Sequence, residues 1–360
     1  YQLVWQDVFD GNKLNTNNWE IEINGDGGGN NELQYYKKEN ISIGKEPISG
    51  ENCLIITGKK ENFSGKTSTS GRLKTLGKMS FKYGKIEARI KMPKTANGLW
   101  PAFWMMGADF PQVGWPKCGE IDIMEFGHVD GISAGTQDRY LIGACHWGEA
   151  WTPQGHPNYA TNTTVSYNVQ DDFHTFTLIW DENAMKMYID MDRYPDNAPY
   201  FEMNIKGKDE ANNVGRYFHK PNFVLLNLAI GGNFTGIWDI NNVTALNASN
   251  NYEAKMYVDY VKVYQKGDAN EEYHGPELSA SLKETILEKE YKIYPNPSFN
   301  KVKIEGPEVP LSITVYTESG KEIMKFENID EIDVSMLVTG NYLLNIVSSK
   351  ITEYHLLIKQ

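Results

Sequence analysis

The length of 360 residues allows one large domain or two ordinary ones, and the formal net charge of −12 argues against a nucleic-acid partner, because phosphate binding relies on clustered Lys and Arg. No apolar run approaches the roughly 18 residues that a transmembrane helix needs. The 3 cysteines, Cys53, Cys118 and Cys145, are an odd number with no zinc-binding spacing, so we expect free buried thiols and no disulfide framework.

Strand patterns dominate residues 1–265. Residues 85–92 alternate between apolar and charged side chains, which predicts a strand with one buried face. Residues 176–180 and 185–189 are apolar runs on either side of a short acidic turn, and this arrangement predicts a hairpin. Residues 253–265 form another long strand pattern. Many strands joined by polar turns indicate one all-β domain, a β-sandwich or jelly roll.

The most informative stretch lies in the middle of this domain, where Glu120, Asp122 and Glu125 are separated only by Ile and Met. Apolar spacers predict a buried strand, on which Glu120 and Asp122 share a face while Glu125 points away. A β-bulge at Ile123 or Met124 would return Glu125 to the same face. Because buried carboxylates need a partner or a task, we predict a bulged strand with three acids on one surface. A chance acidic strand edge is the alternative.

The character of the chain changes after residue 265. Residues 266–290 are polar, charged and poor in β-branched residues, and we interpret them as a linker with a short helix at residues 280–289. A second domain then occupies residues 291–360, and its short strands fit a small Ig-like β-sandwich. We expect these strands at residues 301–305, 313–316, 322–326, 332–334, 342–347 and 354–358.

The acidic strand resembles the catalytic strand of family 16 glycoside hydrolases, and its Glu-x-Asp-x-x-Glu spacing is that of the laminarinase-like branch. Further segments match the family in the expected order, so the resemblance covers about residues 1–265. It implies a concanavalin A-like β-jelly roll that hydrolyses glycosidic bonds, a reaction that needs two carboxyl groups. The other matching segments are residues 29–36, 70–75, 83–89, 98–104, 223–232 and 258–264.

The resemblance also assigns roles to the three acids. It implies that Glu120 is the nucleophile, that Glu125 is the general acid/base, and that Asp122 hydrogen-bonds the nucleophile and tunes its charge. In a retaining glycosidase the two working carboxyls lie roughly 5–5.5 Å apart, and two carboxylates at this distance cannot both ionise cheaply, so one keeps its proton. The chemistry alone would also allow the reverse order of roles.

Aromatic residues flank the acidic strand, and sugar rings stack well on aromatic faces. By resemblance, Trp115 lies near the cleavage point and Trp100 lies under a neighbouring sugar. Trp104 has apolar neighbours, so we expect it in the core. Asn227 is a buried amide that needs hydrogen-bond partners, and it either supports the cleft or fills a structural role.

Five polar residues are candidates for contact with sugar hydroxyls. Asn30, Glu32 and Gln34 alternate along one face of an expected strand, where they either bind sugars or form a polar surface strand. Arg72 either reaches a substrate hydroxyl or pairs with an acid in the cleft. His146, on the expected next strand, either hydrogen-bonds the middle acid or a substrate hydroxyl, or it is a satisfied core histidine.

The resemblance implies a structural calcium ion away from the cleft. Its ligands would include the carboxylate of Asp259 and the backbone carbonyl of Val8, and oxygen donors of this kind suit calcium. We expect no metal or other cofactor in the chemistry itself.

The second domain resembles the C-terminal sorting domain of the type IX secretion system, which proteins of the Bacteroidetes carry. The resemblance rests on residues 294–297, 333–335, 340–342 and 356–360. It implies export across the bacterial outer membrane, followed by attachment to the cell surface or release. A carbohydrate-binding module is the alternative. We favour sorting because this domain has few aromatic residues and no obvious binding stripe.

Together the two resemblances imply a secreted, endo-acting retaining β-glucanase, which we expect to be monomeric. It would cut internal β-1,3 bonds of laminarin or of mixed-linkage β-1,3-1,4-glucan by double displacement. Its partners would be this polysaccharide and the type IX secretion machinery. Two alternatives stay open: another family 16 specificity, such as that of agarase or porphyranase, and a non-catalytic β-glucan-binding protein on the same fold.

Overall fold

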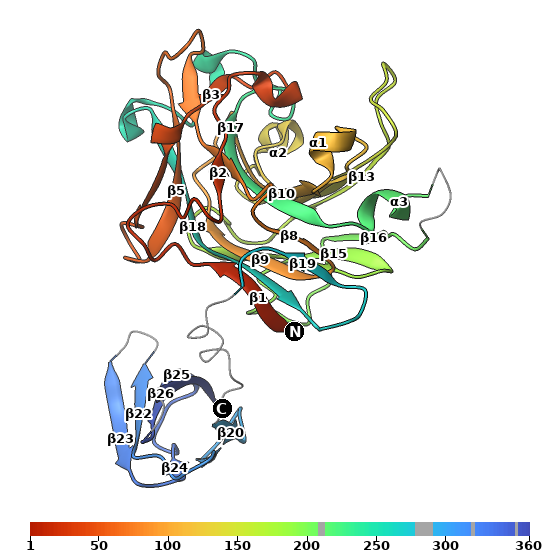
Figure 1. Ribbon diagram of the computed structural model, residues 1–360. Coiled ribbons are helices and arrows are strands. Elements are labelled where there is room, and N and C mark those ends of the chain that lie inside the picture. The colour runs from red at the N-terminus through yellow and green to blue at the C-terminus, as the bar shows by residue number, and fades with distance from the viewer. Residues whose placement is uncertain (208–212, 278–290, 318–320, 350–351) are drawn as a thin grey trace. The chain divides into compact units, whose positions relative to one another are not determined.

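The computed structural model of the chain divides into two compact units, Tyr1–Glu277 and Leu278–Gln360 (Figure 1). Strands build both units, so the predicted all-β fold is confirmed. Among the described residues, no helix is long and apolar enough to cross a membrane. The residues that the structure describes are 1–207, 213–277, 291–317, 321–349 and 352–360.

The first unit is a sandwich of a 10-stranded sheet and a 9-stranded sheet, as the jelly-roll prediction requires. The 10-stranded sheet contains β1 (Gln2–Asp7), β3 (Gln34–Tyr36), β4 (Ile41–Lys45), β5 (Asn52–Lys59), β6 (Ser68–Ser70), β9 (Gly84–Lys91), β14 (His174–Trp180), β15 (Ala184–Ile189), β16 (Phe201–Asn204) and β18 (Glu253–Gln265). The 9-stranded sheet contains β2 (Glu20–Ile21), β7 (Arg72–Lys74), β8 (Ser80–Lys82), β10 (Leu99–Gly107), β11 (Glu120–Glu125), β12 (Tyr140–His146), β13 (Asn158–Thr164), β17 (Asn222–Ile230) and β19 (Glu272–His274).

Short helical segments fill some of the connections. The α-helices are α1 (Phe110–Val113), α2 (Val129–Ala134) and α3 (Gly215–Phe218), and the 3-10 helices are η1 (Gly27–Gly29), η2 (Lys38–Asn40), η3 (Ile240–Asn242) and η4 (Ala248–Asn250).

The core of the first unit lies between the two sheets. On β9 the alternation predicted from the sequence is confirmed, because Ile86, Ala88 and Ile90 are buried while the intervening residues are half-buried. These side chains belong to the same apolar cluster as Phe103 and Met105 of β10. The hairpin is also confirmed, since β14 pairs antiparallel with β15. All three cysteines are free and buried, as expected.

The central strands of the 9-stranded sheet follow the order β12-β11-β10-β17. All nine residues of β17 are buried. Leu226 and Leu228 pack in the core between the sheets, whereas Phe223 and Leu225 join a separate apolar cluster. Alternation therefore places Asn227 on the face of the sheet turned away from the core. This outer face, which we call the site face, carries the acids of β11.

The segment after residue 265 differs from the predicted linker. Residues 272–274 form strand β19, which pairs with β8 and so extends the 9-stranded sheet. Gln265 binds this segment, because its side-chain nitrogen donates to the carbonyl of Glu272 at 2.9 Å. The polar composition reflects an edge strand on the surface and not an unstructured connection. The predicted helix at residues 280–289 lies outside the described residues.

The second unit is also built of strands. One sheet has the order β20-β21-β24 and the other β23-β22-β25-β26, and Val302, Ile313, Val315 and Leu344 are among the residues buried in its core. The expected strands are all present, and they match a small sandwich. Their bounds are β20 (Lys292–Tyr294), β21 (Lys301–Glu305), β22 (Ser312–Thr317), β23 (Glu322–Glu327), β24 (Glu331–Asp333), β25 (Gly340–Val347) and β26 (Thr352–Lys359).

Candidate active site

The bulge predicted for the acidic strand is present at Ile123. On the neighbouring strand β10, Trp104 faces Asp122 and Phe103 faces Met124, which leaves Ile123 without a partner. Ile123 and Met124 are both fully buried in the core. Two consecutive residues therefore point to the core side, and the alternation of side chains between the two faces of the sheet shifts by one residue. As a result the third acid returns to the site face beside the first two.

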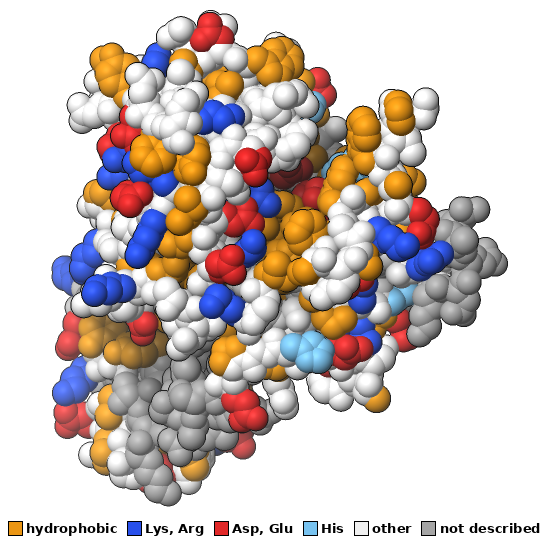
Figure 2. All heavy atoms as spheres, turned by 45° about the horizontal axis from the view of Figure 1, so that its top comes forward, with side chains coloured by type: hydrophobic (Ala, Val, Ile, Leu, Met, Phe, Trp, Pro, Cys, Tyr) orange, Lys and Arg blue, Asp and Glu red, His pale blue; other side chains and the backbone are white. Residues whose placement is uncertain are grey.

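The three acids are largely withdrawn from water. Asp122 is 5% exposed, Glu125 is 7% exposed, and Glu120 is half-buried. The face of the first unit turned toward the viewer in Figure 2 is hollowed, and acidic, histidine and hydrophobic side chains gather in the hollow. A carboxylate in such a place loses hydration, which favours its neutral form.

Burial raises the pKa of every acid in this group. The pKa of Glu120 rises to about 7 and that of Glu125 to about 8, and the negative charge of Glu120 adds to the rise at Glu125. Burial, followed by the charges of both glutamates, raises the pKa of Asp122 well above its usual range. At neutral pH this group therefore holds protons that free carboxylic acids would have lost, and it titrates as one unit.

Different neighbouring groups lower the pKa values of Glu120 and Glu125 and so oppose the effect of burial. The positive charge of Arg72 and a hydrogen bond from Trp115 both lower the pKa of Glu120 and so favour its charged form. Only the hydrogen bond from Trp100 lowers the pKa of Glu125. Glu120 is therefore the glutamate that ionises more readily, while Glu125 keeps its proton to higher pH.

The tryptophans of the site face have distinct contacts. Trp100 Nε1 donates to Glu125 Oε1 at 2.9 Å, and its ring stacks on Phe234 with centroids 4.4 Å apart. Trp115 is 38% exposed, so its ring is accessible to a ligand. The expectation that Trp104 lies in the core is wrong. It is half-buried on the same face of β10 as Trp100, and its Nε1 donates to Asn227 Oδ1 at 2.7 Å.

Arg72 lies on β7 and pairs with an acid, which is one of the two outcomes expected for it. Its Nε is 2.9 Å from Glu22 Oε2, and its guanidinium lies 4.7 Å from the centre of the Trp104 ring. Asn227, which binds Trp104 through its oxygen, donates through Nδ2 to Tyr36 Oη at 3.4 Å. The polar groups thus hold Trp104 in place and set a positive charge near Glu120.

The expectation that Asn30, Glu32 and Gln34 alternate along one strand is wrong. Only Gln34 lies in a strand, while Asn30 ends the turn η1 and Glu32 follows it. Three glycines with positive φ make this turn and stop the strand pattern from extending backwards. Glu32 and Gln34 are 5% and 1% exposed, and Glu32 Oε2 accepts hydrogen bonds from Gln34 Nε2 and Tyr36 Oη.

His146 is at the end of β12, directly opposite Glu120 on β11. Its Nε2 is 3.4 Å from Asp122 Oδ2, and its Nδ1 is 2.8 Å from His156 Nε2. Burial and, to a smaller extent, the neighbouring His156 lower the pKa of His146 to about 4, so the ring is neutral at neutral pH. His156 also contacts Trp115, with ring centroids 4.5 Å apart in an edge-on arrangement.

Sequence reasoning missed two residues of the site face. His156 could have been found from the hairpin, because β12 pairs with β13 and sets His146 opposite Asn158, two residues from His156. Phe234 follows β17 in a glycine-rich turn, and its stacking on Trp100 depends on how that turn folds back. No sequence pattern gives that geometry.

The residues predicted to hold calcium lie on β18, an interior strand of the 10-stranded sheet, and just after β1, which pairs with it. β1 ends at Asp7, which pairs with Val261, so Val8 follows close to Asp259 on the neighbouring strand β18. The register of β18 against β9 shifts between Val258 and Tyr260, which sets Asp259 at a bulge. The two predicted oxygen donors therefore belong to neighbouring strand segments, and the calcium site stays a prediction.

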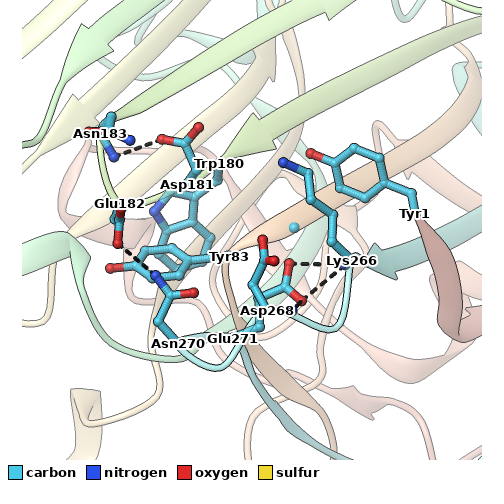
Figure 3. Close-up of a pocket in the computed structure, with 11 residues that line it drawn as sticks. Tyr1, Tyr83, Trp180, Asp181, Glu182, Asn183, Lys266, Asp268, Asn270 and Glu271 are labelled. Atoms are coloured by element: carbon cyan, nitrogen blue, oxygen red, sulfur yellow. Dashed lines mark hydrogen bonds between the residues drawn. The ribbon is translucent and has the colours of Figure 1, made fainter.

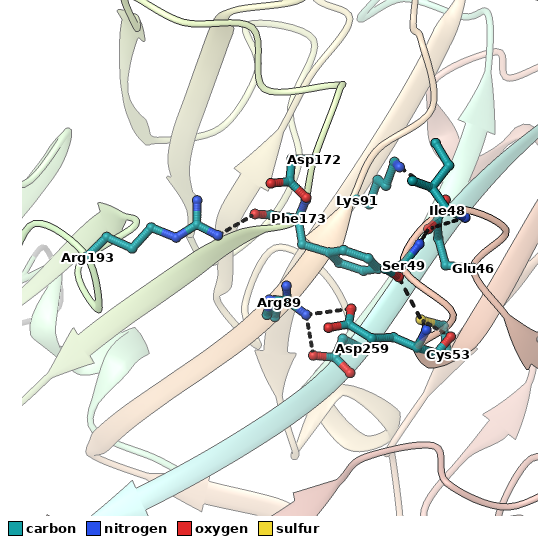
Figure 4. Close-up of polar contacts among 11 residues, drawn as sticks. Glu46, Ile48, Ser49, Cys53, Arg89, Lys91, Asp172, Phe173, Arg193 and Asp259 are labelled. Carbon is teal, nitrogen blue, oxygen red and sulfur yellow. Dashed lines mark hydrogen bonds and ion pairs between the residues drawn. The ribbon is translucent and has the colours of Figure 1, made fainter. Parts of the chain in front are cut away.

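The carboxylate of Asp259 already has a positively charged partner. Arg89 Nη1 is 2.7 Å from Asp259 Oδ2 and 2.8 Å from Glu51 Oε2 (Figure 4). Two carboxylates and nearby backbone oxygens are donors that calcium accepts. A cation here would share Asp259 with the guanidinium.

A second hollow of about 420 Å³ lies elsewhere on the first unit (Figure 3). It is lined by the β14–β15 hairpin and by residues 266–271, and none of the three acids of β11 borders it. Its polar side chains bind each other or nearby backbone: Glu271 accepts from the backbone N–H groups of residues 266–268, and Asn270 donates to Glu182. We therefore assign no chemistry to it.

Replacing Trp100 by Phe should move the alkaline limb of the pH–rate profile to higher pH. The change removes the N–H that donates to Glu125, and this bond lowers the pKa of Glu125. A hydrogen bond to a charged group contributes about 1.5 kcal/mol or more, so we expect a shift of roughly one pH unit. The measurement is kcat against pH on a soluble polysaccharide.

The matched control for this change is Trp104→Phe. Its indole N–H donates to the amide of Asn227 and not to a carboxylate. Both variants lose a nitrogen from the site face, but only the first should change the alkaline limb. An unchanged limb in Trp100→Phe would mean that Glu125 does not set it.

Two family models match this chain. Residues 34–197 match glycosyl hydrolases family 16, and residues 292–360 match the secretion system C-terminal sorting domain. One similar solved structure is a GH16 protein from Bacteroides ovatus, described as belonging to a mixed linkage glucan PUL and bound to the product G4G4G3G. Its sequence is 38% identical to the present chain, and the two structures align with a TM-score of 0.62. This match covers 72% of the present chain and 99% of that chain.

Two curated relatives are longer proteins. The clotting factor G alpha subunit of Tachypleus tridentatus is 37% identical over 74% of the present chain. The glucan endo-1,3-beta-glucosidase A1 of Niallia circulans is 33% identical over 73% of it. The present chain spans only 34% and 38% of the lengths of these two relatives.

Proposed function

Because this chain belongs to glycosyl hydrolases family 16, we propose that it is an endo-acting retaining β-glucanase that cuts β-1,3 bonds of laminarin or of mixed-linkage glucan. The observation that carries the proposal is the bulged strand β11, which brings Glu120, Asp122 and Glu125 to one face with raised pKa values. Paired carboxyl groups with unequal tendencies to ionise are what glycoside hydrolysis requires.

The electrostatic difference between the two glutamates supports their roles. Arg72 and Trp115 favour the charged form of Glu120, which suits a nucleophile that attacks the anomeric carbon. Glu125 keeps its proton to higher pH and can donate it to the leaving oxygen. When Glu120 becomes an ester its charge disappears, so Glu125 loses its proton more easily. It then removes a proton from the water that hydrolyses the ester.

The neighbours of the acids position them for this sequence. Trp100 holds the carboxyl of Glu125 through its N–H, and His146 of the neighbouring strand β12 lies against Asp122. Trp115 is exposed beside Glu120 and offers an aromatic surface on which a sugar ring can stack. No cofactor is needed for these steps, because both proton transfers and the nucleophilic attack use carboxyl groups of the chain.

The C-terminal unit belongs to the sorting domains of the type IX secretion system, which direct proteins to the cell surface or the exterior. An endo-acting enzyme at that place meets glucans that are too large to enter the cell. We propose that the exported protein acts as a monomer, which light scattering of the purified chain would test.

The decisive experiment compares four polysaccharides in parallel. Reducing-end release should be fast on laminarin or barley mixed-linkage glucan, with short oligomers as early products, and slower on insoluble curdlan. Proton NMR of the first products should give the β-anomer, because double displacement retains configuration. Activity on agarose alone would replace the glucanase proposal with a galactan-specific one. Binding of laminarin with no hydrolysis would favour a glucan-binding protein.

We also propose that Asp259 and the carbonyl of Val8 hold a structural calcium ion. A ligand that binds only the folded state stabilises it by about 2.7 kcal/mol at 100 times Kd. Adding calcium to chelator-treated protein should therefore raise Tm by a few degrees. The rise should vanish in Asp259→Asn and persist in Asp196→Asn, a change at an exposed loop carboxylate. Equal Tm values with calcium and with EGTA in the unmodified protein would contradict the proposal.

A further inference from the structure

The site face carries a group of side chains with the composition of a transition-metal site. One ligand atom each from Glu120, Asp122 and His146 lie within 4.8 Å of one another. Over the part of the chain that the structure describes, no other trio of His, Cys, Asp or Glu meets this criterion. The group combines carboxylate oxygens with an imidazole nitrogen, the donor set that zinc accepts.

One atom of this group is buried without a hydrogen-bond partner. Asp122 is 5% exposed, and its Oδ2 has no donor within hydrogen-bond geometry. The nearest polar atom given for it is His146 Nε2 at 3.4 Å, a separation longer than a good hydrogen bond. In a tetrahedral zinc site with bonds of about 2.0–2.1 Å, neighbouring ligand atoms lie about 3.4 Å apart. The two atoms are therefore spaced like two ligands of one ion.

A second histidine sets the orientation of the first. His156 Nε2 is 2.8 Å from His146 Nδ1, so one proton lies between these two nitrogens. When His146 supplies that proton, its Nε2 carries a lone pair that points toward Asp122. Zinc-bound histidines commonly have their other ring nitrogen held by such a partner, which fixes the tautomer and the ring plane. His156 thus acts as a positioning residue for the metal site.

We infer that this face binds one zinc-like divalent cation through Asp122, His146 and Glu120, and that the bound ion blocks glucan hydrolysis. Glu120 is half-buried, so a fourth position can be filled by water. Binding would convert the proposed nucleophile into a metal ligand and leave no free carboxylate to attack the sugar. The binding step stands on geometry alone, while the inhibition step rests on the proposed function.

The test begins with zinc chloride titrated calorimetrically into the full-length, metal-free protein, in buffer with excess calcium so that any calcium site stays filled. We expect one zinc per chain. His146→Gln and Asp122→Asn should each weaken binding by at least about 10-fold, and His156→Gln by a similar or smaller factor. The matched control is His274→Gln, since His274 lies on β19 away from these residues. Cobalt should replace zinc and give visible absorption bands that these ligand changes remove.

Activity on laminarin then tests the consequence. Zinc should lower kcat, because a metal-bound Glu120 cannot attack the sugar, and the zinc concentration that halves activity should follow the calorimetric Kd. Zinc binding that His146→Gln and Asp122→Asn leave unchanged, or no binding to the unmodified protein, would overturn the inference. Circular dichroism checks that each variant is folded. If a ligand variant does not fold, His156→Gln still tests the site, because it keeps all three ligands. Hydrolysis without zinc binding would defeat this inference alone, and zinc binding without hydrolysis would defeat the proposed function alone.

Discussion

Glu120→Gln should lower kcat on laminarin by at least about 10⁴-fold while leaving substrate affinity nearly unchanged. The amide fills the same space, so β11 and its bulge should be retained, but it cannot form the glycosyl ester. The negative charge of Glu120 is also among the causes that raise the pKa values of Asp122 and Glu125. Losing that charge lets both groups ionise at lower pH, which adds to the loss of activity at neutral pH.

The measurement pairs turnover with calorimetric binding of a laminarin oligosaccharide. The matched control is Glu253→Gln at the start of β18, because this glutamate forms a 2.8 Å ion pair with Lys59 on the 10-stranded sheet. We expect the control to keep its activity within a few-fold. Turnover in Glu120→Gln close to that of the unmodified protein would remove Glu120 as nucleophile.

A small anion can identify the role directly. In Glu120→Ala the missing side chain leaves space beside the anomeric carbon, and added azide can attack there from the face that Glu120 occupied. With an activated aryl β-glucoside the product should be the α-glycosyl azide, formed by one inversion. A β-glycosyl azide from this variant would instead assign Glu120 as the acid/base, the reverse order that the sequence chemistry left open.

The bulge on β11 could be predicted because two demands conflict in the sequence. Ile121, Ile123 and Met124 need the core, and three nearby carboxylates cannot be buried there without partners. Strict alternation satisfies Glu120 and Asp122 but not Glu125, and one extra residue resolves the conflict. Both Ile123 and Met124 are fully buried in the structure, as that reasoning requires.

The conformation of Asn30, Glu32 and Gln34 could not be predicted in the same way. Alternating polar residues predict a strand only if the backbone is extended, and the glycines of η1 have φ of 77°, 58° and 74°. The triple glycine was a turn signal that the alternation argument did not weigh. The partners of Glu32, namely Gln34 and Tyr36, depend on the local path of the chain after that turn.

The contacts made by the loops were beyond sequence reasoning for a different reason. Phe234 touches the site face because its loop folds back over it, and loop closure depends on many weak contacts at once. Strand β19 is similar, because its polar residues carry no apolar alternation and it forms only by pairing with the edge of the sheet. Periodicity reports burial within an element, and these features depend on contacts between elements.

Glu125→Gln should lose more activity on substrates whose leaving group must be protonated than on substrates whose leaving group departs without a proton. On laminarin the departing sugar oxygen must be protonated, so we expect a fall of about 10³-fold or more. With a dinitrophenyl glycoside the leaving group departs without a proton, and ester formation on Glu120 should continue at a measurable rate. The ester should then persist, because no general base activates the water that removes it.

Intact-protein mass spectrometry of Glu125→Gln with the dinitrophenyl substrate should therefore show an added glycosyl mass. Azide should speed its removal and give the β-glycosyl azide, formed by two inversions. The comparison is Asp122→Asn, which keeps both glutamates and should slow the two substrates by similar factors. Equal losses on both substrates in Glu125→Gln would mean that Glu125 does not donate the proton.

Glu125 holds its proton because burial and the charge of Glu120 raise its pKa to about 8, so the unmodified protein should lose activity on laminarin as pH rises through that value. That alkaline limb should be missing when Glu125→Gln acts on the dinitrophenyl substrate.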